Sequence, residues 1–387
     1  MDASGPLAGI RVVDFGHVWA GPYCTATLAD LGAEVIKVES THRLDVHRRQ
    51  GPYQEGAPEY DRSGVWNAQN RGKRSVALNL RTSQGRAVAR RLLDASDVTV
   101  ENFSPGVMDR LELSYPVISE SNRGLVYASL SAFGQQGPFR SGVGYGPSLD
   151  AWSGLDSMTR YPGGQPGSLG GVFPDTGSAL YAAAAIIAAL IERGVTGVGR
   201  YIDLSELEVS ALLIGEEVFA RSKRPEGGDD GSEPESSLCV RTSDEAWVYV
   251  GGPDYPLRRL AAALALPGSE AWDSTTARGA VHAWALQHAA PEVIAACVAA
   301  GVPVGKVYDV SEVLADPQLK ARGFFGTSMN PRIEGLPVYG PIAKSSHGGG
   351  DLAAAPELGE ANDYVLFEIL GLSTNEVNSL RAANVLE

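Results

Sequence analysis

Short runs of apolar and β-branched residues alternate with longer segments of helical periodicity through the first half of the chain. The expected strands are Ile10–Phe15, Glu34–Val38, Ser75–Leu80, Asp97–Glu101, Leu125–Leu130 and Arg200–Leu204. The clearest expected helices are Gly21–Leu31, Thr176–Arg193 and a segment from Glu206 to about Ala220. Strands that alternate with helices at this spacing form βαβ units, so the pattern predicts an α/β fold with a mainly parallel sheet.

The pattern changes at residues 223–237, where glycine, proline and aspartate are frequent. These residue types favour turns, so we expect a linker there and a smaller second domain after it. In that domain we expect a strand at Ala246–Val250 and helices at Ala261–Leu266, Val281–His288 and Pro291–Ala300. Two short helices are expected near the end, at Asp363–Leu370 and Thr374–Ala382.

Composition narrows the classes of function. The 387 residues are 44% hydrophobic, which is enough for two domains with buried cores. The formal net charge of −14 argues against nucleic-acid or anionic-membrane partners, so an anionic ligand would need locally concentrated basic residues. The three scattered cysteines and the absence of a basic, apolar leader predict a cytoplasmic protein. The apolar stretch Ala182–Ile191 is too short to span a bilayer and is expected to be a buried helix.

Asp175 precedes the long apolar helix and has two interpretations. It could be a helix N-cap, whose carboxylate accepts backbone N–H bonds. It could also be a nucleophile, because a carboxylate at a helix N-terminus is ionised at neutral pH and needs no base.

Basic residues gather in two places, Asn70–Ser75 and His42–Arg49. Each could be a solvated loop or a phosphate site. The loop after the first strand, Gly16–Gly21, lacks the GxGxxG pattern of dinucleotide-binding proteins. The six histidines have no metal-binding spacing, so no metal site is expected.

Several segments, in order along essentially the whole chain, resemble the CaiB/BaiF family of coenzyme A transferases (family III). They are Pro6–Phe15 with Ala20–Pro22, Leu31–Glu39, Asn70–Ser75, Glu101–Gly106 with Asp109–Leu111, Phe133–Pro138, Pro174–Asp203, Gly301–Val304, Asp316–Pro317, Ala321–Gly323, Pro356–Gly359 and Leu370–Leu372.

The resemblance implies a Rossmann-like large domain built from residues 1–222 and 331–387, a small α+β domain at 238–330, and two interlinked chains in a homodimer. It also implies that Asp175 is the catalytic carboxylate. In this family, CoA moves from an acyl-CoA to a carboxylic acid through an aspartyl anhydride and an aspartyl-CoA thioester. The partners implied are therefore an acyl-CoA and a carboxylic acid as substrates, with no tightly bound cofactor.

Family positions carry over to CoA contacts at Val18, Trp19, Ala20, Lys73, Asn102, Phe103, Arg110 and Leu111. Many members have an arginine after the glutamate of the second strand, whereas Ser40 follows Glu39 here. We therefore expect Arg43 to hold a CoA phosphate instead.

Two alternatives remain open. An α-methylacyl-CoA racemase of the same family would pair the aspartate with a Gly-His-Asp element, but the equivalent stretch is Gly144-Tyr145-Gly146. The second alternative is a non-catalytic CoA-binding subunit, and the presence of Asp175 argues against it. Trp19, Tyr145 and Trp152 could line an apolar acyl site or could belong to the core.

Overall fold

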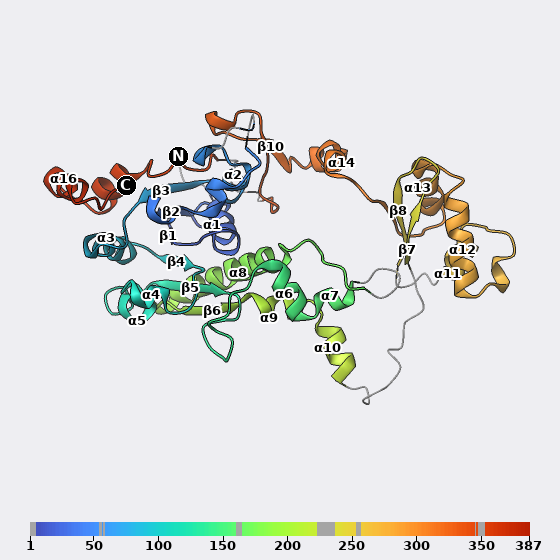
Figure 1. The fold of residues 1–387 in the computed structure, drawn as a ribbon, viewed down its shortest axis with the longest axis horizontal. Helices are drawn as coiled ribbons and strands as arrows, with labels where there is room; N and C mark the ends of the chain where they lie inside the picture. The colour runs from blue at the N-terminus through green and yellow to red at the C-terminus, as the bar shows by residue number, and fades with distance from the viewer. Residues whose placement is uncertain are drawn as a thin grey trace. The chain divides into compact units, whose positions relative to one another are not determined.

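The computed structural model describes residues 5–53, 56, 59–159, 165–222, 237–252, 257–344, 346 and 353–387. The chain divides into two compact units, residues 1–219 with 323–387, and residues 220–322 (Figure 1). The chain returns to the first unit ahead of the expected boundary at residue 331, because the β10–β11 pair belongs to that unit. The predicted linker at 223–237 lies outside the described residues except for Ser237, which begins a strand.

The first unit is built on a six-stranded sheet in which every pair of neighbouring strands is parallel. The strands are β1 (Arg11–Asp14), β2 (Glu34–Glu39), β3 (Lys73–Ala77), β4 (Val98–Glu101), β5 (Val126–Ser131) and β6 (Tyr201–Ser205). Their order, β3-β2-β1-β4-β5-β6, is that of a doubly wound, Rossmann-like sheet. The predicted α/β fold with a parallel sheet is confirmed, with each strand displaced by a few residues at most.

Alternate residues of each strand enter two different cores. Val12 and Val35 pack in one cluster with helices on one face, whereas Val13 and Ile36 pack in a second cluster on the other face. Both faces are covered because successive side chains of a strand point in opposite directions. A parallel sheet buried on both faces explains why these strands read as continuous apolar runs.

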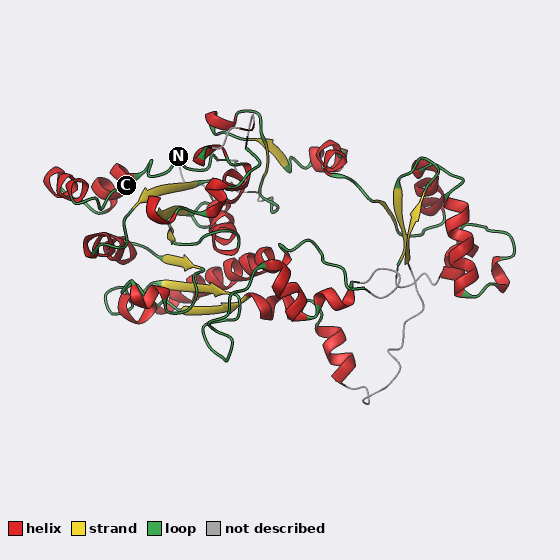
Figure 2. Cartoon of the chain, in the orientation of Figure 1, coloured by secondary structure: helices red, strands yellow, loops and turns green. Residues whose placement is uncertain are grey.

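The first unit contains both helices that pack on these two faces and helices outside the two cores (Figure 2). They are α1 (Ala20–Asp30), α2 (Gly64–Gln69), α3 (Ser83–Asp94), α4 (Val107–Arg110), α5 (Tyr115–Ile118), α6 (Gly146–Ser153), α7 (Leu155–Met158), α8 (Phe173–Thr196), α9 (Glu206–Leu212), α10 (Gly215–Ser222), which crosses the unit boundary, and α16 (Thr374–Ala382). The single helix expected from Glu206 to Ala220 is wrong, because the chain turns between α9 and α10. The helix expected at Asp363–Leu370 is a π-helical turn at Tyr364–Ile369.

Helix α8 carries Asp175 in its first turn and contributes one face to the first core. It is 24 residues long and, by length and composition alone, could cross a membrane. The helix is longer than the apolar stretch Ala182–Ile191 because it continues beyond that stretch on both sides. The expected burial holds for one face of the helix, whereas on the outer face Ile191 is 69% and Val195 88% exposed.

The second unit has a three-stranded antiparallel sheet of β7 (Ser237–Arg241), β8 (Trp247–Gly251) and β9 (Val304–Lys306). Its helices are α11 (Leu257–Ala263), α12 (Ser274–Ala285), α13 (Ala290–Ala299), α14 (Val310–Ala315) and α15 (Pro317–Ala321). The first three of these helices pack with the sheet around their own core. In the first unit, β10 (Phe325–Thr327) pairs antiparallel with β11 (Pro337–Tyr339).

Candidate active site

The order of the strands reverses between β1 and β4, and their carboxyl ends lie side by side there. Open α/β sheets bind ligands in the crevice outside such a switch point. The loop after β1 is tied to the loop after β4 by one side chain: Asn102 Oδ1 accepts from the His17 backbone N–H at 2.7 Å, and its Nδ2 donates to the His17 carbonyl at 2.9 Å. Asn102 therefore shapes this crevice through the His17 backbone.

Val18, in the loop after β1, has a φ of +66°. A β-branched residue adopts this conformation only under strain, and such strain concentrates at functional sites. The Val18 backbone N–H donates to both carboxylate oxygens of Asp45, at 3.2 and 3.3 Å, which helps to hold the conformation. As a result, Val18 and Trp19 both line the pocket.

Buried charges lie beneath this loop. Lys73 Nζ donates to Asp14 Oδ2 at 2.9 Å, to the Pro22 carbonyl at 2.8 Å and to Asn70 Oδ1 at 2.8 Å. Burial raises the pKa of Asp14, but Lys37 and Lys73 more than offset this and lower it to about 2. Burial lowers the pKa of Lys73 to about 8. Lys73 is fully enclosed, acts as a counter-ion to Asp14 and does not line this cavity.

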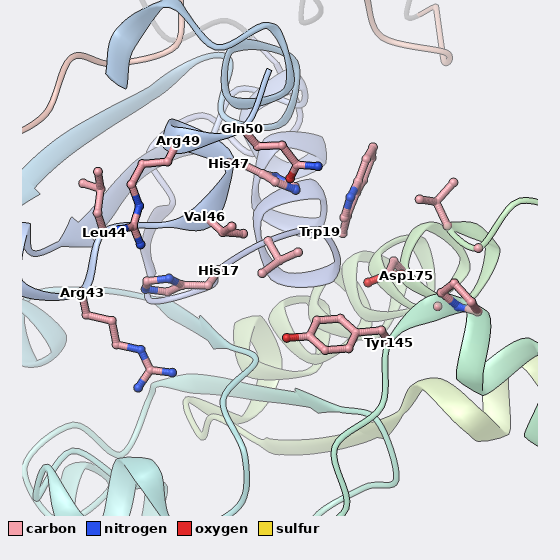
Figure 3. A pocket seen from close by; sticks show the side chains of 15 residues that line it. His17, Trp19, Arg43, Leu44, Val46, His47, Arg49, Gln50, Tyr145 and Asp175 are labelled. Carbon is pink, nitrogen blue, oxygen red and sulfur yellow. The ribbon is translucent and has the colours of Figure 1, made fainter. Parts of the chain in front are cut away.

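A cavity of about 550 Å³ opens at the switch point. Its walls come from the loop after β1, residues 43–50 after β2, the start of α6, and the turn that leads into α8 (Figure 3). The lining residues are His17, Val18, Trp19, Arg43, Leu44, Val46, His47, Arg49, Gln50, Tyr145, Gly146, Pro147, Gly171, Val172 and Asp175.

Asp175 is the third residue of α8 and presents its carboxylate to this cavity. It is not the N-cap, since that position is Val172, which makes no side-chain capping bond. Burial, with Asp150 adding to it, raises the pKa of Asp175 to about 6, so the carboxyl is mostly ionised at neutral pH. The first turn of a helix favours that ionised form. The position therefore supports a nucleophile that is partly buried and held at a helix N-terminus.

Gly146, the first residue of α6, allows this wall to close on Asp175. A Cβ at Gly146 would lie 1.5 Å from the Gly171 carbonyl oxygen and 3.0 Å from Asp175 Oδ2. Only glycine fits at this close approach of two backbones.

Two more carboxyl groups lie close enough to Asp175 to interact with it electrostatically. Asp150 of α6 is fully buried, and neither of its oxygens has a hydrogen-bond partner. Burial raises the pKa of Asp150, with a further contribution from Asp156. Burial also raises the pKa of Glu206, at the start of α9, to about 8, and the charge of Asp175 adds to this shift. The surroundings of Asp175 are thus poor in cations and resist additional negative charge.

The cations of the pocket lie on the wall formed by residues 43–50. The Arg43 guanidinium lies 5.8 Å from the centre of the Phe103 ring, in the loop after β4. Arg49 also lines the pocket and makes no ion pair with any residue in the described ranges. Arg48, between them in sequence, is fully buried against Glu39 and Asp61.

Ser40 stands where many family members place an arginine, and its hydroxyl donates to Glu387 at 2.9 Å. It is therefore engaged with a carboxylate and is not free for an anion. Of the expected phosphate ligands, only Arg43 faces the pocket.

Two histidines line the same wall. Burial lowers the pKa of His17 and of His47. Both are therefore mainly neutral at pH 7 and add no fixed positive charge. The His47 ring meets the Trp19 ring edge-on, with centroids 5.5 Å apart, and holds the indole in place.

The structure brings together only part of the expected set. Val18, Trp19, Arg43 and Asp175 line the cavity, and Asn102 and Phe103 adjoin it through His17 and Arg43. Ala20, Arg110 and Leu111 do not line it. Sequence reasoning missed Arg49 and His47 as pocket residues, although both belong to the second basic cluster. Tyr145 is a pocket residue and 66% exposed, whereas Trp152 packs on Phe133 and Phe139 outside the cavity.

Comparison with known proteins agrees with this geometry. A sequence profile described as CoA-transferase family III matches residues 7–362. The chain is 30% identical, over 98% of both chains, to the succinyl-CoA–D-citramalate CoA-transferase of Chloroflexus aurantiacus. It is 35% identical, over 82% of this chain and 84% of the other, to the succinate–glutarate CoA-transferase of Agrobacterium fabrum.

A solved structure agrees at the level of the fold. The crystal structure of a CaiB/BaiF family protein from Brucella suis has a TM-score of 0.81 and 30% identity, covering 95% of this chain and all of the other. The profile spans most of the chain, and both relatives are matched over more than four fifths of their length. The chain belongs to CoA-transferase family III and is an enzyme of that type.

Proposed function

We propose that the enzyme transfers CoA from an acyl-CoA to a carboxylic acid by covalent catalysis at Asp175. The single observation that carries the proposal is the placement of this carboxylate: it faces a cavity at the switch point of the sheet, in the first turn of α8, with a pKa of about 6. A carboxylate that is ionised yet partly shielded from water is a suitable nucleophile for a thioester.

In the first half of the reaction, a carboxylate oxygen of Asp175 attacks the thioester carbonyl carbon. The C–S bond breaks, CoA leaves as the thiolate, and an aspartyl anhydride forms. The thiolate then attacks the side-chain carbonyl of Asp175 in the anhydride. The C–O bond breaks, the donor acid leaves as a carboxylate, and Asp175 carries CoA as a thioester.

In the second half, the acceptor carboxylate attacks the aspartyl thioester and expels the thiolate, which gives a second anhydride. The thiolate attacks the acceptor carbonyl, so a new acyl-CoA forms and the Asp175 carboxylate is restored. No proton is gained or lost. The scheme therefore needs no general base.

For CoA we propose a path along the loop after β1, past Val18 and Trp19, to the loop at Asn102 and Phe103. Arg43 and Arg49 supply the positive charge for its phosphates. A CoA thioester laid this way places its nucleotide at the arginine wall and its carbonyl at Asp175. Lys73, Ala20, Arg110 and Leu111 have no place in this path.

The racemase alternative has weaker support. Tyr145 occupies the pocket wall where that reaction would need a histidine as an acid–base partner to the carboxylate.

We also propose that the chain forms a homodimer. The outer face of α8 leaves Tyr181, Ile191 and Val195 exposed at 53%, 69% and 88%, and such apolar faces mark association surfaces. A cytoplasmic location fits the three free cysteines, Cys24, Cys239 and Cys297.

The covalent step is tested by mass spectrometry of the protein after brief incubation with a panel of acyl-CoAs. We expect a mass increase that maps to a peptide containing Asp175 and disappears when an acceptor acid is added. Rapid transfer with an adduct on any other residue would contradict the assignment of Asp175.

A further inference from the structure

Two aromatic side chains flank the reactive carboxylate. In Figure 3 the Asp175 carboxylate lies between the Trp19 indole and the Tyr145 ring, and all three line one cavity. Pro147 and Val172 add apolar surface on the same side, and Val172 is 42% exposed. Any acyl group whose carbonyl reaches Asp175 therefore meets an apolar wall.

Building on the proposed function, we propose that the acyl substrate is an apolar monocarboxylic acid, with an aryl or alkyl side chain, and that Trp19 is the residue that selects it. This substrate class applies to the cavity that contains Asp175. It separates this enzyme from transferases of dicarboxylic acids, whose acyl groups carry a second carboxylate.

The distribution of charge supports this choice. A second carboxylate needs a cation near the acyl group. Within the described residues, the pocket lining offers two such cations, Arg43 and Arg49, and both belong to the wall after β2. Arg43 lies against Phe103, beside the loop that we assign to the nucleotide.

The charge on the opposite side acts against a second carboxylate. Asp175 is negative when it attacks, and among the described residues the two helices that flank it, α6 and α8, contribute no basic side chain to the pocket lining. A distal carboxylate placed there would meet like charge in a partly buried site. A hydrocarbon group meets no such penalty.

Trp19 is held before substrate arrives. It is the residue directly before α1, and the His47 ring contacts it edge-on. A fixed aromatic surface gains affinity for an apolar group without first losing much conformational entropy. Trp19 therefore contributes selectivity, whereas Asp175 contributes the chemistry.

The test uses CoA thioethers, which bind like thioesters but cannot transfer. Calorimetry compares S-methyl-, S-butyl-, S-benzyl- and S-(3-carboxypropyl)-CoA. At about fourfold in affinity per buried methylene, we expect the butyl and benzyl compounds to bind about tenfold or more tightly than the methyl compound. The carboxypropyl compound, of similar length to butyl but anionic, should bind about tenfold more weakly than butyl. Equal or tighter binding of the carboxypropyl compound would overturn the inference.

Two variants locate the effect. Trp19→Ala should lower affinity for the butyl and benzyl compounds about tenfold more than for the methyl compound, because only the larger groups contact the indole. Arg49→Gln, the matched control, should weaken all four compounds by the same factor, because it acts on the phosphates. A loss confined to the carboxypropyl compound in Arg49→Gln would instead assign Arg49 to a distal carboxylate and contradict the inference.

A transfer assay on the same preparation separates the two proposals. If the thioethers bind as expected but CoA passes between no pair of acids, the proposed function fails while the ligand assignment holds. If CoA passes between dicarboxylic acids with a higher kcat/KM than between benzoate and butyrate, the ligand assignment fails while the proposed function holds.

Discussion

Opposing influences set the ionisation of Asp175. Burial and the neighbouring Asp150 raise its pKa, whereas the hydrogen bond that its carboxylate accepts from a backbone N–H lowers it. The resulting pKa is about 6. The carboxyl is therefore neutral in mild acid and ionised at neutral pH. Only the ionised form can attack a thioester.

We therefore expect kcat/KM to be constant above about pH 7 and to fall about tenfold per pH unit below pH 6, because the protonated fraction of Asp175 grows. An ordinary carboxylic acceptor stays ionised down to about pH 5, so its own titration does not produce this limb. The measurement is the rate of CoA transfer between pH 4.5 and 8. A rate that stays flat down to pH 5 would contradict the raised pKa.

Glu206 offers a test by stability. Its folded pKa is raised from 4.5 to about 8, so between these values the folded protein binds more protons than the unfolded chain. The free energy of unfolding must then fall as pH rises through that window. Glu206→Gln removes the titration and should be more stable than the parent at pH 8, by a few kcal/mol at about 1.4 kcal/mol per pH unit.

Urea unfolding of both proteins at pH 5 and pH 8 checks this expectation. The parent should lose more stability than Glu206→Gln over that interval. Parallel losses in the two proteins would show that Glu206 is not held neutral by the fold.

At the scale of single residues, the sequence predicts well what a local motif carries. Asp175 is expected in the pocket because of its position in the family resemblance, and it lines the cavity. Arg43 is expected there because Ser40 replaces the usual arginine, and it also lines the cavity. The ion pair of Lys73 with Asp14 could not be predicted, because Asp14 lies 59 residues away and a basic loop gives no sign of a distant buried carboxylate. Arg49 is missed for a related reason: Arg48 and Arg49 are adjacent, yet one is buried in ion pairs and the other lines the cavity.

At the scale of elements, the approach of α6 to α8 decides the shape of the site. Gly146→Ala places a Cβ against the Gly171 carbonyl, which must move by more than 1 Å to relieve the 1.5 Å contact. Since misplacement of about 1 Å can cost two orders of magnitude in rate, we expect transfer to fall about tenfold to a hundredfold.

The matched control is Gly194→Ala, a glycine of the same helix as Asp175 with open space around its Cβ position. It should keep the parent rate and gain up to about 1 kcal/mol of stability, because alanine favours helix. Steady-state kinetics and thermal melting of both variants check the pair. Parent-like transfer by Gly146→Ala would show that the contact does not shape the site.

Elements are predictable to different degrees. The six strands of the parallel sheet are recovered because short β-branched runs alternate with helical segments along the chain, although β6, at the edge of the sheet, is only partly buried. The break between α9 and α10 is not predicted, because the apolar periodicity continues through Leu213 and Ile214 and no proline or glycine precedes Gly215. In the second unit, β9 has only three residues, too few for a pattern, and its pairing with β8 comes from tertiary contacts.

At the scale of the whole molecule, the exposed apolar face of α8 is the surface that we propose packs against a second copy of the chain. Sedimentation should give twice the chain mass of 40.7 kDa. Val195→Glu, at an 88% exposed position, should shift the protein toward the monomer because it buries a charge in the interface. Glu192→Gln, one turn away in a surface ion pair with Arg200, is a mild control. A parent protein that sediments as a monomer would contradict the proposed dimer.

The covalent role of Asp175 is tested most directly by Asp175→Asn. Asparagine keeps the size and polarity of the side chain in the first turn of α8 but cannot form an anhydride. The measurement is CoA transfer between two carboxylic acids, with thermal melting of the same samples and mass spectrometry to exclude hydrolysis back to aspartate. We expect melting within a few degrees of the parent and transfer reduced by at least about a thousandfold. Transfer at the parent rate by the intact asparagine variant would contradict the role of Asp175 as the nucleophile.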